Sequence, residues 1–465
     1  MAKVLVSPIG TGSFKKGSNG DSSAREYNKA TYKFEEVNKT YETPFLAAAL
    51  AQYLKVDKII FIGTAKSMWE EIYRYFTTSS GRELNYEYWA EIGQLAMESS
   101  NNCSLINEEI LKETMESVDQ YLKAKGSISA GGSTPLIIKY GLNKEELWQN
   151  FSTIMELVDL LNDGDEIYLD VTHSFRSIPL FLYLMIDFML ILNQKKIKLK
   201  GLYYGMLEAT RDLGYAPVVD LKPLYEISSW IRGGHEFINY GNGYLISELI
   251  KEKEGLSENL EEISSKINNI TELVNINYLI DLQNQIKGLN SLISDKYTSN
   301  GAMAYVFPLI KGFLLRFSNI QTPSEFQLEL SKWYFENKKY GHGYICLVES
   351  VLTKLCEVYG LDLENLTNRE KMKELVSNRY FQSKSNLLKT LADKYHGINK
   401  IRNRIAHASY YQVGSYSFKS DIEQAIYRYD EIRKLFERKD IYELTNVISL
   451  EEIQNSINKR KKRHQ

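Results

Sequence analysis

The sequence is poor in cysteine and has no apolar run long enough to span a membrane. Its cysteines, Cys103, Cys346 and Cys356, are far apart and form no CxxC pair, so neither a disulfide framework nor a zinc site is indicated. The most apolar stretch, residues 178–192, contains Asp187 and is shorter than the roughly 18 residues that a membrane helix needs. The first apolar run is too short for a signal peptide. We therefore expect a cytoplasmic protein with no metal site, no cofactor and no membrane association.

Charge of neither sign is in excess. Lys and Arg total 57 and Asp and Glu total 59, a net charge of -2, so the overall charge does not indicate a nucleic-acid-binding protein. The exception is a basic cluster at residues 459–464, which either attracts RNA phosphates non-specifically or is a disordered, solvated tail. A hydrophobic content of 43% over 465 residues predicts a globular chain of two or three domains.

Strand and helix signals alternate in the first half of the chain, and helical signals alone fill the second. The alternation over residues 1–224 predicts a Rossmann-like domain with a parallel sheet, closed at one edge by a strand at 218–221. After residue 225, apolar residues recur at the three-to-four spacing of amphipathic helices. We predict an α/β domain at 1–224, a helical connecting region at 225–335 and a helical domain with a basic tail at 336–465.

Three predicted strands end in small or polar turns. The strands at 4–6, 58–62 and 167–171 run into turns at 10–14, 64–68 and 172–176. Because ligands of parallel sheets bind outside the carboxyl ends of the strands, we expect one binding edge there. For each turn taken alone, a plain turn or a helix cap is the alternative. The candidate ligand-binding residues are Gly10, Thr11, Gly12, Ser13, Phe14, Thr64, Ala65, Lys66, Ser67, Met68, Asp170, Thr172, His173, Ser174, Phe175 and Arg176.

The glycine-rich turn at 10–14 matches no standard nucleotide fingerprint. A GxGxxG motif would need glycine at Lys15, and a Walker A loop would need lysine at Ser18. A turn that presents backbone N–H groups to an anion is compatible with the sequence. Triphosphate hydrolysis is not supported, and a Rossmann-like oxidoreductase is disfavoured.

A second set of polar residues lies on a helix predicted over 395–411. Three residues form its apolar stripe, Ile398, Ile401 and Ile405. Asn403 and His407 are four residues apart and share a face. His can move the proton of an RNA 2′-hydroxyl or of the leaving 5′-oxygen, and Arg402 can stabilise charge on the phosphate, which suits RNA cleavage without a metal. One helix supplies one Arg and one His, so two copies about a twofold axis would give a fuller site. The alternative is a helix end with exposed arginines and no chemistry.

Taken together, these motifs resemble the CRISPR-associated CARF–HEPN ribonucleases of type III systems. Residues 170–176, Asp-Val-Thr-His-Ser-Phe-Arg, resemble the D-x-T-H-G-F-R signature of the family's ligand-sensing domain, with Ser174 in place of glycine. The turns at 10–14 and 63–69 resemble the loops after that domain's first and following strands. Residues 402–407, Arg-Asn-Arg-Ile-Ala-His, match the R-N-x-x-x-H motif of HEPN nucleases. The motifs stand in both halves of the chain and in the family's order.

The resemblance implies a Rossmann-like CARF domain, then a helical region, then a C-terminal helical HEPN domain. It implies that the three turns bind cyclic oligoadenylate, with tetra-adenylate favoured, as an allosteric activator of a homodimer or higher oligomer. The activated protein would cleave single-stranded RNA without a metal in antiviral defence. Arg402 and His407 would be catalytic, with Asn403 in support.

Two other functions fit the same motifs. In a ring nuclease, a 2′-hydroxyl of the cyclic ligand, held near Thr172 or His173, would attack its own phosphate. In a non-enzymatic sensor or regulator, the helical half would serve as a partner-binding or dimerisation module. The pairing of Arg402 with His407 argues against the second function.

Overall fold

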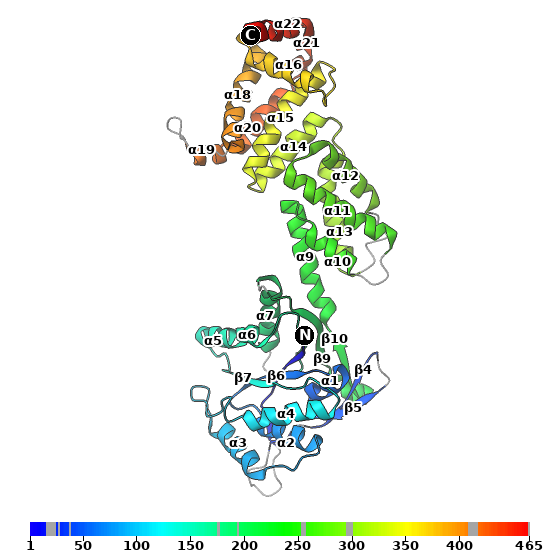
Figure 1. Ribbon diagram of the computed structural model, residues 1–465, viewed down its shortest axis with the longest axis vertical. Coiled ribbons are helices and arrows are strands. Elements are labelled where there is room, and N and C mark those ends of the chain that lie inside the picture. The colour runs from blue at the N-terminus through cyan, green and yellow to red at the C-terminus, as the bar shows by residue number, and fades with distance from the viewer. Residues whose placement is uncertain are drawn as a thin grey trace. The chain divides into compact units, whose positions relative to one another are not determined.

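The computed structural model describes residues 1–14, 25–26, 28–36, 39–173, 177–192, 195–252, 257–293, 301–407 and 417–463. The candidate residues Ser174, Phe175 and Arg176 lie outside the described residues, as do the side chains of Ser13 and Phe14. The chain divides into two compact units, Met1–Glu226 and Ile227–Gln465. The first holds the sheet and the second is helical (Figure 1).

The first unit is built on an eight-stranded sheet whose order is β5-β4-β10-β9-β8-β1-β6-β7. Its parallel part consists of β1 (Lys3–Pro8), β6 (Lys58–Thr64), β7 (Thr134–Ile138), β8 (Glu166–Asp170) and β9 (Lys198–Gly205). The remaining strands of this sheet are β4 (Ala30–Phe34), β5 (Thr40–Thr43) and β10 (Ala216–Asp220). A separate antiparallel pair is formed by β2 (Ser13–Phe14) and β3 (Arg25–Glu26). The predicted Rossmann-like sheet is therefore confirmed, with a mixed side.

The strand β10 does not close the sheet at an edge, as the sequence had suggested. It lies between β9, to which it is antiparallel, and β4, to which it is parallel. Only residues 206–215 separate β9 from β10, and they form the short helices η1 (Leu207–Ala209) and α8 (Thr210–Leu213). A parallel return needs a crossover of a dozen or more residues, so this short connection forces antiparallel pairing.

Helices cover both faces of the sheet (Figure 1). Successive strand residues point to opposite faces, so Leu5 packs into one core while Val4 and Val6 pack into the other. The first core holds α1 (Leu46–Leu54), α2 (Trp69–Ser79), α3 (Tyr86–Glu98) and α4 (Lys112–Ala124). The second holds α5 (Lys144–Met155), α6 (Leu157–Leu160) and α7 (Ile178–Leu192). Both faces of the central strands are thus buried, which explains their continuous apolar sequence.

Threonine followed by proline, as at Thr43, is a common start of a helix, but α1 begins later, at Leu46. Thr43 is instead the last residue of β5, where it pairs with Ala30. Its hydroxyl oxygen accepts a hydrogen bond from the Phe45 N–H at 3.2 Å, so it orders the turn between strand and helix rather than capping the helix.

The second unit is entirely helical in the part of the chain that the structure describes. After α9 (Lys222–Tyr240), which begins in the first unit, come α10 (Tyr244–Lys251), α11 (Glu258–Ile276), α12 (Leu279–Leu292), α13 (Met303–Ser318), α14 (Pro323–Glu336), α15 (Tyr340–Val358), α16 (Leu366–Ser377), α17 (Arg379–Lys384), α18 (Asn386–Ala406), α19 (Phe418–Glu423), α20 (Ala425–Phe436), η3 (Lys439–Glu443), α21 (Leu444–Val447) and α22 (Leu450–Arg463). They enclose two hydrophobic cores, and both cores take residues from α14 and α15. The division into three domains stays a prediction.

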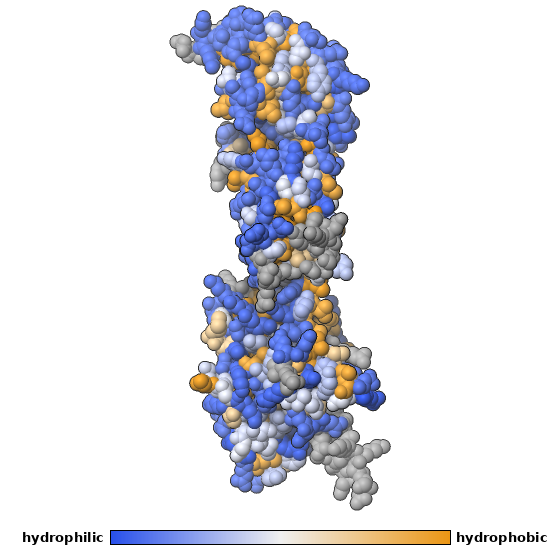
Figure 2. Space-filling view, turned by 90° about the vertical axis from the view of Figure 1, so that its right-hand side faces the viewer, coloured by the Kyte–Doolittle hydropathy of each residue, from blue (hydrophilic) through white to orange (hydrophobic). Residues whose placement is uncertain are grey.

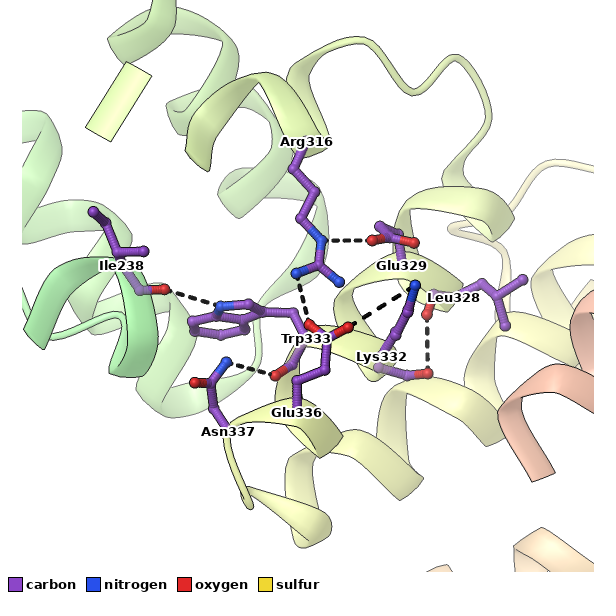
Figure 3. A network of polar contacts seen from close by, with 9 residues as sticks. Ile238, Arg316, Leu328, Glu329, Lys332, Trp333, Glu336 and Asn337 are labelled. Atoms are coloured by element: carbon purple, nitrogen blue, oxygen red, sulfur yellow. Dashed lines mark hydrogen bonds and ion pairs between the residues drawn. The ribbon is translucent and has the colours of Figure 1, made fainter. Parts of the chain in front are cut away.

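A polar network joins α9, α13 and α14 within this unit (Figure 3). Arg316 pairs with Glu329 at 2.5 Å and with Glu336 at 2.7 Å, and Trp333 donates its indole N–H to the Ile238 carbonyl at 3.0 Å. The indole ring packs in the apolar core beside these contacts. These bonds fix α9 and α13 to α14.

Two surface features bear on the sequence predictions. The basic cluster is helical as far as Arg463, so the expectation of a disordered tail is wrong for residues 459–463. On the face seen in Figure 2, hydrophilic side chains predominate and apolar ones lie in separate patches. Among the described helices, none combines the length and the apolar character that crossing a membrane requires.

Candidate functional site

The structure brings the starts of the three predicted turns together at one edge of the sheet. β1 lies between β8 and β6 and is parallel to both, with Val6 opposite Leu169 and Pro8 opposite Ile62. The carboxyl ends of the three strands therefore share one edge, as the sequence predicted. We call this edge the ligand edge; that it binds a ligand stays a prediction.

The first two turns are locked to each other by hydrogen bonds. The Ser67 hydroxyl donates to the Ile9 carbonyl at 3.0 Å and accepts from the Thr64 N–H at 2.9 Å, and the Met68 N–H donates to the Gly10 carbonyl at 3.2 Å. Ser67 and Met68 are almost fully buried. These two candidates therefore shape the turns from inside.

The third turn is anchored by Asp170, whose side chain is completely buried. One carboxylate oxygen accepts the Ser7 hydroxyl at 2.7 Å, and the other accepts the Thr172 N–H at 2.9 Å. The Thr172 hydroxyl oxygen accepts the Gly205 N–H at 2.8 Å, which ties the turn to the end of β9. Burial of the imidazole lowers the pKa of His173, against a smaller upward effect of Asp170. Asp170 thus positions the turn.

A cavity of about 260 Å³ opens beside the ligand edge, at the ends of β6 and β7. Its lining includes Thr64, Ala65 and Lys66 of the second turn, and also residues that the sequence analysis missed: Ser100, Asn101, Asn102, Ser104, Ile137, Ile138, Lys139 and Tyr140. Lys139 and Tyr140 directly follow β7, so the rule applied to the other strand ends would have found them if this strand had been included. The loop around Asn101 lies between two helices and carries no comparable signal.

Asn101 fixes the wall of this cavity. Its amide oxygen accepts the Tyr140 N–H at 2.8 Å, and its amide nitrogen donates to Glu146 at 2.7 Å. Glu146 also accepts the N–H groups of Gly141 and Leu142. The Leu142 N–H is the main reason that the pKa of Glu146 lies below its usual value. The wall is thus held in place before any ligand arrives.

The second candidate site lies at the end of α18. Ser385 caps the start of this helix by accepting the Leu388 N–H at 3.3 Å. Ile398 and Ile401 are buried as predicted, but Ile405 is 40% exposed, so the apolar stripe ends one turn earlier. The helix ends at Ala406, and the N–H of His407 donates to the Asn403 carbonyl at 3.0 Å. His407 is exposed at the helix end.

The two arginines of the motif have different partners. Arg404 forms a 2.6 Å ion pair with Asp421. Arg402 is only 3.9 Å from Glu349 of α15, and Arg369 of α16 holds the other oxygen of the same carboxylate. Arg402 is 24% exposed, and its Nε is buried without a hydrogen-bond partner among the described residues. Of the two, Arg402 has the guanidinium that is less fully paired.

Among the described residues, no three or more His, Cys, Asp or Glu side chains are placed to hold a metal ion together.

Comparison with known proteins places this geometry in a family. Residues 4–208 match the family model described as the CARF domain of the CRISPR system endoribonuclease Csx1. Residues 226–325 match the model for the second domain of the CRISPR-associated protein MJ1674. The MJ1674 protein of Methanocaldococcus jannaschii is 43% identical over 428 residues, which are 92% of this chain and 65% of that protein. The chain therefore spans just under two thirds of this curated relative.

These matches identify a CARF-containing protein. More particularly, the chain is a CRISPR-associated CARF protein related to MJ1674. A solved structure, Enterococcus italicus Csm6 bound to cyclic hexa-2′-fluoro-hexa-dAMP, aligns with 98% of this chain and 100% of its own, at 10% identity and a TM-score of 0.38. Similarity at that level is too low to support a statement about this chain.

Proposed function

We propose that this chain is an endoribonuclease that cleaves single-stranded RNA without a metal when cyclic oligoadenylate binds its CARF domain. The proposal rests on the arrangement of two side chains at the end of α18. There Arg402 keeps a partly exposed, loosely paired charge five residues before the exposed His407. A cation and an imidazole near one another are the groups that RNA cleavage needs.

The proposed chemistry is internal transesterification. His407 takes the proton of the 2′-hydroxyl, the 2′-oxygen attacks phosphorus, and the bond to the 5′-oxygen breaks. A proton delivered to that oxygen completes a 5′-hydroxyl and leaves a 2′,3′-cyclic phosphate. Arg402 stabilises the charge that develops on the phosphate oxygens, and Asn403 supports the site. One imidazole cannot be base and acid in the same step, so a second copy of the chain completes the site.

The ligand edge is the proposed activator site. Its cavity of about 260 Å³ is smaller than the roughly 300–1,000 Å³ of pockets that enclose drug-sized ligands, so it suits one base of a ring rather than the whole ring. Lys66 and Lys139 on its lining suit the neighbouring phosphates. A ring with a twofold axis would lie across two copies of the edge, and tetra-adenylate is the favoured size.

An exposed stripe on α7 supports a dimer of CARF domains. Leu180, Leu184 and Phe188 are 65%, 51% and 42% exposed and follow one another at four-residue spacing, so they share a face. The opposite face of α7 packs on the sheet through Ile178, Leu182 and Met185. A helix that is apolar on both sides is usually buried on both, which a second copy would achieve. Activation then requires that the ring bind the active dimer more tightly than the inactive one.

The proposal is tested by mixing the protein with labelled single-stranded RNA in EDTA and adding cyclic tri-, tetra- or hexa-adenylate separately. Cleavage that one ring size switches on is the expected result. Ring binding without RNA cleavage would contradict the nuclease proposal and favour a regulator. Decay of the ring in a His407→Ala variant would instead favour the ring nuclease.

A further inference from the structure

Three helices of the second unit meet at one carboxylate. Glu349 of α15 bonds through one oxygen to Arg369 of α16, which also donates to the Thr353 hydroxyl at 3.3 Å. Its other oxygen is 3.9 Å from the Arg402 guanidinium of α18. Tyr395 lies on the same face of α18 as Arg402 and is buried beside this cluster. Burial raises the pKa of the Tyr395 hydroxyl, and the charge of Glu349 raises it further. Neither Glu349 nor Arg369 lies in a motif that the sequence shows.

The two arginines share the carboxylate unequally. Arg369 makes a close, charge-assisted hydrogen bond to Glu349 and a second bond to Thr353, and its side chain is only 18% exposed. Arg402 makes no hydrogen bond to Glu349 at 3.9 Å. One negative and two positive groups leave one unit of positive charge, and the geometry leaves it on Arg402.

This asymmetry matters because the Glu349 carboxylate and an RNA phosphate would compete for the Arg402 guanidinium. A carboxylate with both oxygens free binds an arginine through two parallel hydrogen bonds, the same fork that an arginine offers to a phosphate. If Arg369 did not occupy Glu349, the carboxylate could close on Arg402 and neutralise it. A phosphodiester would then have to break a bidentate ion pair before it could bind.

We propose that Arg369 is a positioning residue of the nuclease site, which occupies Glu349 so that Arg402 keeps its charge for the scissile phosphate of RNA. The inference rests on the proposed function, because it takes Arg402 as the phosphate-binding cation. It assigns Arg369 no contact with RNA. Its effect on catalysis passes entirely through Glu349.

A double-mutant cycle tests this role, with KM and kcat for RNA measured in the presence of the activating ring. Arg369→Ala is expected to raise KM about fivefold, the scale of a partly buried ion pair. Glu349→Gln removes the competitor and is expected to leave KM at or below the wild-type value. In the Glu349→Gln background, Arg369→Ala is expected to leave KM unchanged within about twofold, because residue 349 then has no negative charge that could pair with Arg402.

A purely structural role for Arg369 predicts a different pattern. Loss of packing would raise KM to the same extent in both backgrounds, and that result would overturn the proposal, as would a wild-type KM in Arg369→Ala. Lys394→Ala is the matched control, since it removes another interhelical cation, one that pairs with Glu431. It is expected to leave KM unchanged.

Two further variants separate the possible failures. Arg369→Lys keeps a charge beside Glu349 and remains informative if the alanine variant misfolds. Its KM is expected to lie within about twofold of the wild-type value. A folded Arg369→Lys protein with a KM as high as that of Arg369→Ala would overturn the proposal. Arg402→Ala tests the proposed function itself. If it cleaves RNA as fast as wild type, both proposals fall. If it is inactive while Arg369→Ala behaves as wild type, only the role of Arg369 falls.

Discussion

Ser7 on β1 donates its hydroxyl to the carboxylate of Asp170 at the end of β8, with 2.7 Å between the oxygens, and both residues are buried. The same carboxylate holds the Thr172 N–H through its other oxygen. One buried acid therefore connects the middle strand of the ligand edge to the start of the turn whose sequence resembles the sensing signature of CARF domains. Its bonds within the protein make Asp170 a support for the turn.

Ser7→Ala is expected to lower the free energy of unfolding of the first unit by about 1–3 kcal/mol, because it leaves a buried carboxylate oxygen without its donor. Denaturant unfolding of the full chain would measure this loss. Ring affinity is expected to fall as well, since the third turn loses its anchor. Ser117→Ala is the control: Ser117 is equally buried but bonds only to a carbonyl within its own helix. A Ser7→Ala variant with normal ring affinity would show that the hydrogen bond between Ser7 and Asp170 is not needed for ligand binding.

Gly12→Ala is expected to damage the first turn more than backbone strain alone can explain. Gly12 has φ +67°, and an added Cβ would lie 1.7 Å from the Met68 sulfur. Gly81 has φ +81° with no atom within 4 Å of that position, so Gly81→Ala reports strain without a clash. Strain of this kind costs roughly 1 kcal/mol. The melting temperature should fall further in Gly12→Ala, and only this variant should bind the ring more weakly. Equal losses in the two variants would show that the contact with Met68 is unimportant.

The imidazole of His173 is expected to make stability depend on pH. Its pKa is lowered by burial, so the folded protein binds this proton less readily than the unfolded chain. In the unfolded chain this histidine has its ordinary pKa of about 6.5, so below that pH the unfolded chain binds the proton and the folded protein does not. The free energy of unfolding therefore falls as the pH drops from about 6.5 toward the pKa of His173 in the folded protein. Melting temperatures at about pH 7.5 and pH 5.5 should therefore differ less in His173→Asn than in wild type. An identical difference in both would contradict the direction of the shift.

Arg402→Ala and His407→Ala are each expected to reduce RNA cleavage about a hundredfold or more, the usual cost of losing a charge-stabilising or proton-transferring group. Ring affinity should stay near the wild-type value, because the changes are confined to the second unit. Arg404→Ala is the control on the same helix, since its guanidinium pairs with Asp421. Cleavage retained in either of the first two variants, or lost equally in Arg404→Ala, would refute the assignment of the site.

Much of the ligand edge could be predicted from sequence because it depends on local signals. A buried strand followed by a small or polar turn is visible within about ten residues, and parallel strands place such ends together. The pairing of β10 was not visible, because it follows from the length of a connection that gave no strand or helix signal of its own. The burial of Ser67 and Met68 also required the tertiary structure, since nothing in the sequence of this turn separates its buried residues from its exposed ones.

By itself, the sequence determined the order of the two halves, the strands whose ends form the ligand edge, and the helix that carries Arg402, Asn403 and His407. Those features follow from periodicity and short motifs. Only the tertiary structure showed which arginine is less fully paired, because Glu349, Arg369 and Arg402 lie on three helices separated in sequence. It likewise placed Asn101 and Lys139 on one cavity. Contacts between distant segments depend on how apolar faces pack. The sequence next to a polar residue therefore does not predict which distant residues it will contact.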